Sequence, residues 1–456
     1  MSRRRVALGV GANAIDRIAI ALMTLLLVPV LASHWGLARY GGWAMLVTVP
    51  SLFALGDLGF ANAAAVRMTM EIARGELREA RSTIRSATQV VAIACGVILA
   101  FVGGLAWLLP DRFILDVPLT SHLEMRWAIV ALAIYACLVM ACALLQGVFR
   151  SNARFALGTV LSTVTTVLEN GLLVLMVWLD HGIGAGAAAM MTGRLIGFVA
   201  MFTVAATLRT GVLPGLTGGS QSVRRELLGP ALAAMSIPLA TALLLQGTVA
   251  ALGLVAGAVV VPAFVAARTL SRIGLQGSQI LTTALMPEFG AETAKGNHRA
   301  VIRMFVAVLS TATAIAVPFS LVLALAGPWI VNLWSNGHIA ASQSLMFAIA
   351  VSALCGGIWN PLSNLMLAVN RQAEFAIVYA ILAALGVALT LLLGPALGNT
   401  APGLALAVVD FAMLLVVGRF ALKHWVRRHN LTEVSSEMAQ EARADLDRLI
   451  GRKAKD

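Results

Sequence analysis

The sequence is poor in charged residues. Only 12% of its 456 residues are Asp, Glu, Lys or Arg, whereas soluble globular proteins usually carry about a quarter. Hydrophobic residues make up 59% of the chain, and the mean hydropathy is +0.89. So little charge excludes a soluble globular protein of ordinary composition and indicates a chain that folds in a bilayer.

Residues that bind metals or carry redox chemistry are also scarce. The four cysteines lie inside apolar runs without a C-x-x-C pair, and the seven histidines never occur at the spacing of a metal site. The loop at 110–126, on the side expected to be extracytoplasmic, is too short to hold a catalytic constellation. We therefore expect no cofactor, no metal and no enzymatic activity.

Long apolar runs dominate the rest of the sequence. Because a helix rises about 1.5 Å per residue, roughly 20 apolar residues are needed to cross about 30 Å of hydrocarbon. By this criterion the sequence predicts an all-α integral membrane protein with about twelve transmembrane helices. The predicted spans are 11–33, 41–64, 89–109, 127–147, 157–179, 183–207, 229–251, 255–277, 305–327, 344–369, 374–393 and 400–421.

The basic residues are distributed unevenly between the loops that join these spans. The formal net charge is +12, and most of the 33 Lys and Arg residues fall on one side of the predicted membrane. Only Arg39, Arg112 and Arg126 lie in loops on the other side. The positive-inside rule therefore predicts that both termini are cytoplasmic. Because the charge follows the topology, we expect no nucleic-acid partner.

A repeated pattern indicates two related halves. Residues Glu71, Ala73, Arg74, Gly75 and Arg78 recur 221 positions later as Glu292, Ala294, Lys295, Gly296 and Arg299. A second match pairs Leu144, Val148, Arg150 and Phe155-Ala156 with Leu365, Val369, Arg371 and Phe375-Ala376, at offsets of 221 and then 220. The two matches have nearly one spacing, so we interpret them as one internal repeat.

The repeat predicts the organisation of the whole chain. We expect an N-terminal six-helix half over 1–210, a cytoplasmic linker over 211–228, a C-terminal six-helix half over 229–424 and a charged cytoplasmic tail over 425–456. Because six is an even number, both halves enter the membrane from the same side. Parallel repeats of this kind are typical of transporters that work by alternating access.

Several predicted spans carry ionisable side chains. A charge at mid-membrane costs about 2.5–3.5 kcal/mol on insertion scales, so such residues normally face a bundle interior or water. Arginine stays ionised and binds phosphate with two parallel hydrogen bonds. The pattern predicts a hydrated cavity with a positive lining for an anionic head group. The predicted substrate-binding residues are Arg17, Arg194, Arg268 and Arg272, and the candidates for ion coupling are Asp16, Asp57 and Glu169.

The same residues have a structural interpretation that the sequence leaves open. Arg17 or Arg194 can pair internally with Asp57, Glu169 or Asp410 and hold helices together without contacting a substrate. Each assignment therefore depends on which side chains the fold brings together.

Short motifs in a fixed order suggest a family. They are Leu55-Gly56-Asp57-Leu58-Gly59-Phe60, Leu145-Gln146-Gly147-Val148-Phe149-Arg150 with Arg154-Phe155, Leu285-Met286-Pro287-Glu288-Phe289, Val331-Asn332-Leu333-Trp334 and Leu367-Ala368-Val369-Asn370-Arg371. With these motifs the chain resembles the bacterial polysaccharide flippases of the multidrug, oligosaccharidyl-lipid and polysaccharide exporter (MOP) superfamily, of the O-antigen or exopolysaccharide type. The resemblance covers nearly the whole chain.

This resemblance implies a fold and an activity. The fold would be that of the MATE transporters and flippases, and the activity would be the flipping of undecaprenyl-diphosphate-linked oligosaccharide across the bacterial inner membrane for surface polysaccharide biosynthesis. The lipid-linked oligosaccharide, membrane lipids and polysaccharide polymerase or export proteins would be its partners. Related flippases hold the diphosphate with arginines on the first and eighth helices, where this sequence has Arg17, Arg268 and Arg272.

Three alternatives compete with this expectation. A multidrug or small-molecule exporter of the same fold takes cationic drugs and is expected to have an acidic cavity. The peptidoglycan lipid-precursor flippase is similar but generally has two more helices. A membrane enzyme such as a polysaccharide polymerase needs a larger extracytoplasmic loop than 110–126.

Overall fold

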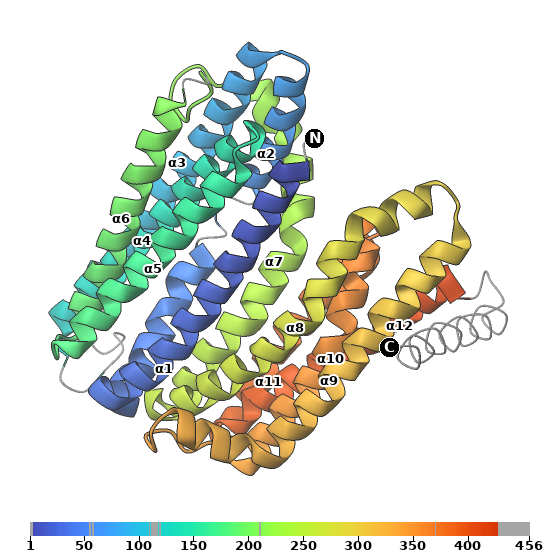
Figure 1. Ribbon diagram of the computed structural model, residues 1–456. Helices are drawn as coiled ribbons and strands as arrows, with labels where there is room; N and C mark the ends of the chain where they lie inside the picture. Colours follow the sequence, from blue (N-terminus) through green and yellow to red (C-terminus); the bar gives the residue numbers. More distant parts are fainter. Residues whose placement is uncertain are drawn as a thin grey trace, which may run out of the picture. The chain divides into compact units, whose positions relative to one another are not determined.

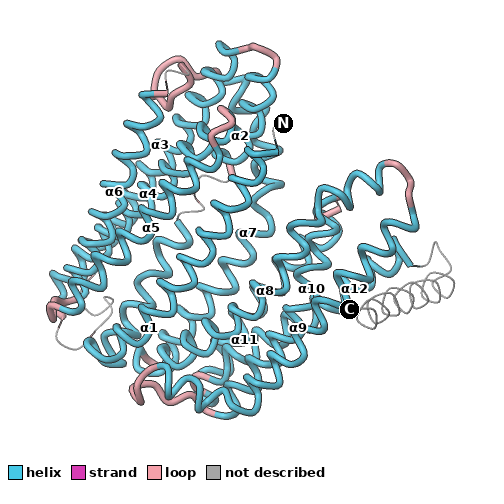
Figure 2. The backbone as a smooth tube through the Cα atoms, in the orientation of Figure 1, coloured by secondary structure: helices cyan, strands magenta, loops and turns pink. Residues whose placement is uncertain are grey.

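A computed structural model shows a chain built from helices joined by short loops (Figure 2). The structure describes residues 3–53, 56, 59–108, 110, 117, 120–208, 211–369 and 371–426. No strand occurs among these residues. The predicted tail at 425–456 lies almost entirely outside them.

Most helices follow the predicted spans and extend beyond several of them at one end, whereas the predicted span 41–64 is divided between the first two helices (Figure 1). In chain order they are α1 (Arg3–Phe53), α2 (Phe60–Ala73), α3 (Leu77–Leu108), α4 (His122–Ser151), α5 (Phe155–Trp178), α6 (Ile183–Thr207), α7 (Gln221–Ala256), the 3₁₀ turn η2 (Ala258–Val260), α8 (Val261–Ala294), α9 (His298–Trp334), α10 (Gln343–Ala368), α11 (Ala373–Leu397), α12 (Thr400–Ala421) and the π-turn η3 (Leu422–Val426).

The first helical segment contains two membrane spans. Eleven segments of the described chain are long and apolar enough to cross a membrane, and one of them, Gly11–Phe53, has 43 residues. At about 1.5 Å per residue it would be roughly 65 Å long, twice the hydrocarbon thickness. The helix is interrupted at Gly36, where φ is 70° and ψ is 172°, and the chain turns back there (Figure 1). Counting this segment as two spans confirms the predicted multi-pass, all-α membrane fold.

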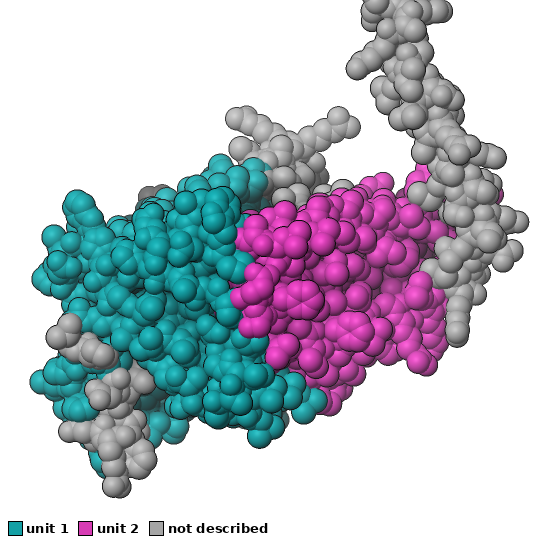
Figure 3. Space-filling model, turned by 90° about the horizontal axis from the view of Figure 1, so that it is seen from below, with its two compact units in different colours: residues 1–269, 328–342, 383–402 teal, residues 270–327, 343–382, 403–456 magenta. Residues whose placement is uncertain are grey.

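The chain divides into two compact units (Figure 3). Unit 1 comprises residues 1–269, 328–342 and 383–402, and unit 2 comprises residues 270–327, 343–382 and 403–456. The division into two six-helix halves joined by a linker at 211–228, with a tail from 425, stays a prediction.

The core of unit 1 is packed from small side chains. Ala64, Ala80 and Ala87 are fully buried where α2, α3 and α4 meet, and Met68 and Ile84 fill the space between them. Small residues let helix backbones approach closely, which is the main source of helix association in lipid because apolar side chains gain little by leaving it.

The connection between α6 and α7 is fixed to α3. Arg81 donates from Nε to the carbonyl of Gly211 at 2.7 Å, and Gln89 donates to the carbonyl of Leu216 at 2.8 Å. Val212 is fully buried against the α2–α3 core. The predicted linker over 211–228 is therefore an ordered strap as far as Ser220 and continues as the first turns of α7.

The first repeat match is reproduced in the backbone. Gly75 and Gly296 both have positive φ, 82° and 71°, which glycine adopts without steric cost. The same pair of hydrogen bonds ends α2 and α8: Gly75 N to Ile72 O (3.1 Å) with Glu76 N to Glu71 O (2.9 Å), and Gly296 N to Thr293 O (3.1 Å) with Asn297 N to Glu292 O (3.0 Å). The 221-residue offset is therefore a structural repeat at this turn.

The second match is shifted by one helical turn. The bond that ends α4 runs from Arg154 N to Phe149 O, and its equivalent after α10 runs from Arg371 N to Met366 O, each at 2.9 Å. These bonds are 217 positions apart, not the 220 or 221 of the sequence match. The helix ends therefore differ from the offset of the sequence match by about one turn of helix.

Candidate functional site

Two of the predicted site residues form a buried ion pair between α5 and α6. Arg194 donates from Nη2 to Glu169 Oε1 at 2.5 Å. The relative exposure is 2% for Glu169 and 9% for Arg194. Each charge is therefore compensated by the other in place of water, as ionised groups inside a bilayer require.

Tyr135 of α4 completes this site, which we call the Glu169 cluster (Tyr135, Glu169 and Arg194). The Tyr135 hydroxyl donates to Glu169 Oε1 and accepts from Arg194 Nη2, both at 3.2 Å, and the guanidinium lies 5.3 Å from the centre of the tyrosine ring. Glu169 Oε2 and Arg194 Nε are buried and have no hydrogen-bond partner within the described part of the chain. The cluster connects three helices through one carboxylate oxygen.

Two glycines explain why these charges meet. A Cβ on Gly193 would lie 2.6 Å from the Cα of Glu169, and a Cβ on Gly197 would lie 2.1 Å from Cγ2 of Thr165. The G-x-x-x-G spacing therefore brings the backbones of α5 and α6 into contact. This close approach positions Arg194 directly beside the carboxylate.

The first helix carries the next two predicted residues. Asp16 accepts a hydrogen bond from the Thr163 hydroxyl of α5 at 2.6 Å, which ties α1 to the N-terminal helices. The side chain of Arg17 is exposed, as are those of Asn13 and Thr24. Because Asn13, Arg17 and Thr24 recur at helical spacing, they share one polar face of α1.

The two predicted arginines of α8 differ in their surroundings. Arg268 is partly buried in unit 1, donates to the Leu245 carbonyl of α7 and lies 5.4 Å from the ring centre of Phe264. Arg272 is one turn further along and exposed. Because their spacing is i, i+4, both lie on one face of α8.

Arg272 belongs to a second polar cluster, within unit 2. Asp410 of α12 accepts from the Ser352 hydroxyl at 2.5 Å and from the Trp359 indole at 2.9 Å, both on α10. Arg272 is close enough to interact electrostatically with this carboxylate. Tyr379 of α11 packs edge-on against Trp359 at 5.3 Å. We call these five residues the Asp410 cluster.

The structure therefore sorts the predicted site residues. Arg194 and Glu169 are paired with each other, Asp16 accepts a hydrogen bond from a hydroxyl, and Arg17 and Arg272 are exposed residues. Asp57, a predicted ion-coupling residue, lies outside the described residues.

The sequence missed the acceptor role of Asp410. Its isolated position in an apolar span was visible, and we considered it only as an ion-pair partner. Its two donors lie on α10, more than fifty positions earlier in the chain, so no local pattern connects them.

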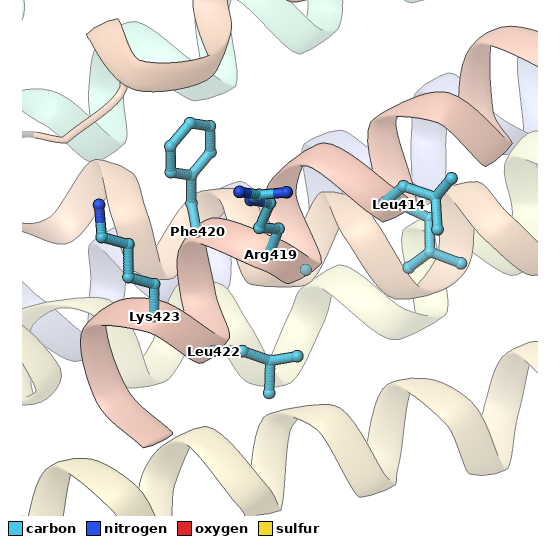
Figure 4. Close-up of a pocket in the computed structure, with 7 residues that line it drawn as sticks. Leu414, Arg419, Phe420, Leu422 and Lys423 are labelled. Atoms are coloured by element: carbon cyan, nitrogen blue, oxygen red, sulfur yellow. The ribbon is translucent and has the colours of Figure 1, made fainter. Parts of the chain in front are cut away.

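A hollow of about 830 Å³ lies at the end of α12. Its described lining includes Leu414, Leu415, Arg419, Phe420 and Lys423, and the side chains of Arg419, Phe420 and Lys423 point to the same side of the helix (Figure 4). Both cations are exposed. This hollow contains none of the predicted site residues.

Similarity to known proteins comes from structure alone. No protein-family model matches the sequence, and no curated protein does. An inward-facing multidrug resistance MATE family transporter of the MOP superfamily superposes with a TM-score of 0.72 at 14% identity, over 93% of this chain and 98% of that one. The lipid II flippase MurJ, in an inward closed conformation, superposes with a TM-score of 0.70 at 12% identity, over 90% of this chain and 87% of that one.

A third solved structure shares the fold. It is a MOP superfamily transporter from Pyrococcus furiosus, for which a reverse polarity of the binding pocket suggests a different function. It matches with a TM-score of 0.53 at 13% identity, over 91% of this chain and 93% of that one. Together these matches cover nearly the whole chain, which therefore has the fold of the MATE and MurJ transporters of the MOP superfamily.

Proposed function

We propose that this protein is a flippase that moves a lipid-linked oligosaccharide with a diphosphate head group across the bacterial inner membrane by alternating access, for surface polysaccharide biosynthesis. The undecaprenyl-diphosphate carrier and the polysaccharide pathway come from the sequence resemblance. The fold supports transport of some kind, because the structural neighbours are transporters and a lipid flippase.

One observation carries the choice of an anionic cargo. Three described carboxylates of the predicted spans are engaged, each within its own unit: Asp16 by Thr163, Glu169 by Arg194 and Asp410 by two donors of α10. Arg17 and Arg272 are exposed instead. Exposed arginines favour binding of phosphate, for which the guanidinium has matching geometry.

Within this proposal, Arg17, Arg268 and Arg272 contact the diphosphate. Arg194 takes the alternative role that the sequence left open, because its ion pair with Glu169 holds α5 against α6. Asp16 and Asp57 remain proposed for ion coupling.

The orientation in the membrane is part of the proposal. The excess of Lys and Arg in one set of loops supports cytoplasmic termini in the inner membrane. The two six-helix halves, 1–210 and 229–424, would then expose the site alternately to the cytoplasm and to the outer leaflet.

Mass spectrometry of polyprenyl-diphosphate-linked glycans tests the proposal in cells. In a strain depleted of the protein, lipid-linked oligosaccharide should accumulate, and wild-type protein should restore the normal pool. Arg17→Ala and Arg272→Ala should fail to restore it, whereas Arg419→Ala, which removes an exposed arginine of α12 outside the site, should succeed.

Another outcome would replace the proposal with its main competitor. An unchanged lipid pool together with altered sensitivity to cationic drugs would identify a multidrug exporter, the activity named for the MATE neighbour. Accumulation of the peptidoglycan lipid precursor instead would identify a lipid II flippase.

A further inference from the structure

A proline inside α1 leaves one backbone carbonyl without its helical donor. In a regular helix the carbonyl of Leu25 would accept from the N–H of residue 29, but that residue is Pro29, which has no N–H. An unpaired backbone oxygen is costly inside a bilayer, and a neighbouring helix can supply the missing donor. The indole Nε1 of Trp334, the last residue of α9, donates to this oxygen at 3.0 Å. We call this hydrogen bond the α1–α9 latch.

The turn that follows α9 fixes the position of Trp334. Ser335 is fully buried, and its hydroxyl accepts from the N–H of Ile339 at 3.0 Å. The N–H of Gly337, where φ is 83°, donates to the carbonyl of Asn332 at 2.8 Å. These bonds close the end of α9 within one turn of Trp334. The indole is therefore presented to α1 by an ordered helix end.

On either side of this carbonyl, α1 is bonded to the predicted N-terminal half. Asp16 accepts from the Thr163 hydroxyl of α5 at 2.6 Å, and the indole of Trp35 donates to the carbonyl of His181, in the turn before α6, at 2.8 Å. Of these three bonds of α1, only the latch runs to the predicted C-terminal half. Trp35 makes the same kind of bond within one half and is therefore its natural control.

The end of α9 belongs to the same compact unit as α1. Unit 1 takes in residues 328–342 and 383–402 of the predicted C-terminal half, whereas residues 270–327 and 343–382 belong to unit 2. In the proposed orientation the two segments in unit 1 lie toward the extracytoplasmic side. There Gly41 of α1 also lies against the carbonyl oxygen of Ala258 in η2, so closely that a Cβ would clash. The extracytoplasmic ends of the two predicted halves are therefore packed together within unit 1.

We propose that Trp334 is a positioning residue for transport: the latch holds the extracytoplasmic side closed and breaks when the site opens to the outer leaflet. This inference rests on the proposed function, because alternating access requires the two halves to separate on that side. Arg17 lies on the same helix, about two turns before Leu25. The latch therefore positions α1, and with it Arg17, while the site faces the cytoplasm.

The strength of one hydrogen bond suits a contact that must break in every cycle. A bond of this kind changes an equilibrium by a factor of roughly 2 to 10. When the extracytoplasmic side opens, water can replace the indole at the Leu25 carbonyl, because a bridging or bound water is nearly as good a partner. The latch therefore biases the equilibrium toward the closed extracytoplasmic side without locking it.

Labelling of Thr24→Cys with a membrane-impermeant maleimide tests the proposal in the full chain. Thr24 is exposed and precedes Leu25 in α1. The reagent is added to right-side-out and to inside-out membrane vesicles, and the parent protein, with its four native cysteines, gives the background. The reporter with Trp334 intact should react faster from the cytoplasmic face.

Trp334→Phe keeps a ring and removes the donor. Added to the Thr24→Cys reporter, it should raise the extracytoplasmic rate and lower the cytoplasmic rate, so that their ratio changes by roughly 2- to 10-fold. Trp35→Phe, which removes an indole bond within one half, should leave the ratio unchanged.

The two rates separate release of the latch from a folding defect. A misfolded protein would react faster from both faces. That outcome, an unchanged ratio in Trp334→Phe, or an equal shift in Trp35→Phe would overturn the inference alone. Exchange of lipid-linked oligosaccharide in liposomes is measured on wild-type protein in parallel. A ratio that shifts as expected in a protein that exchanges no such lipid would support the latch and overturn the proposed cargo.

Discussion

Removing one member of the Glu169–Arg194 pair should destabilise the protein more than removing both. The two side chains are almost fully buried and share a 2.5 Å contact between Arg194 Nη2 and Glu169 Oε1. Arg194→Met leaves the carboxylate without a counter-charge, and Glu169→Leu leaves the guanidinium without one. Breaking a buried pair in this way costs about 3–5 kcal/mol.

The double variant should cost much less than the sum of the two single variants. Glu169→Leu with Arg194→Met leaves no charge, and apolar residues of similar volume often replace a buried pair without loss. The Tyr135 hydroxyl still loses both of its cluster partners, which costs about 1–3 kcal/mol. The two single losses sum to about 6–10 kcal/mol. The double variant should therefore lose at least about 3 kcal/mol less than this sum.

Equilibrium unfolding in mixed micelles at increasing SDS measures these free energies. Adding Tyr135→Phe to the double variant should recover further stability, because it removes the orphaned hydroxyl. Additive losses, with the double variant as unstable as the two single variants together, would refute the view that the pair holds α5 against α6.

Two further predictions use unfolding of the same kind. Gly197→Ala should lose about 1–3 kcal/mol of stability by overpacking, because its Cβ would lie 2.1 Å from Cγ2 of Thr165. Adding Thr165→Ala should restore part of this loss. An unchanged free energy of unfolding in Gly197→Ala would contradict the close contact between the helices. Glu71→Gln should lose about 1.5–3 kcal/mol, because this buried carboxylate accepts from the Arg67 guanidinium at 2.7 Å and from the Thr83 hydroxyl. Glu292→Gln, at the repeat-equivalent turn, should change stability little, and equal losses at both positions would contradict their different burial.

The features that the sequence predicted correctly depend on local properties. The membrane spans follow from the length of the apolar runs, which the bilayer thickness sets directly. The sequence repeat around Gly75 and Gly296 coincides with equivalent turns, because each turn needs a positive φ that glycine adopts without steric cost. The second repeat match differs from the offset of the helix ends by about one turn, because sequence identity at a turn does not determine at which residue the helix ends.

The partners of the charges could not be predicted, because they depend on how the helices rotate against one another. Arg194 was expected to bind substrate, and it lies beside Glu169 because Gly193 brings the two backbones together. Asp410 receives its donors from α10, which no spacing within α12 can indicate. Arg17 was predicted from its charge inside a membrane span, and this residue is exposed.

The central claim, that exposed arginines of this fold carry a diphosphate-linked lipid across a bilayer, is tested most directly by reconstitution. Full-length protein is placed in liposomes that contain polyprenyl-diphosphate-linked oligosaccharide with a fluorophore on the sugar, and a reductant that cannot cross the membrane bleaches only the outer leaflet. We predict that wild-type protein makes the inner-leaflet label accessible, that Arg17→Ala and Arg272→Ala abolish this exchange, and that Arg419→Ala retains it. Exchange no faster than in protein-free liposomes, or equal rates in all four proteins, would contradict the account.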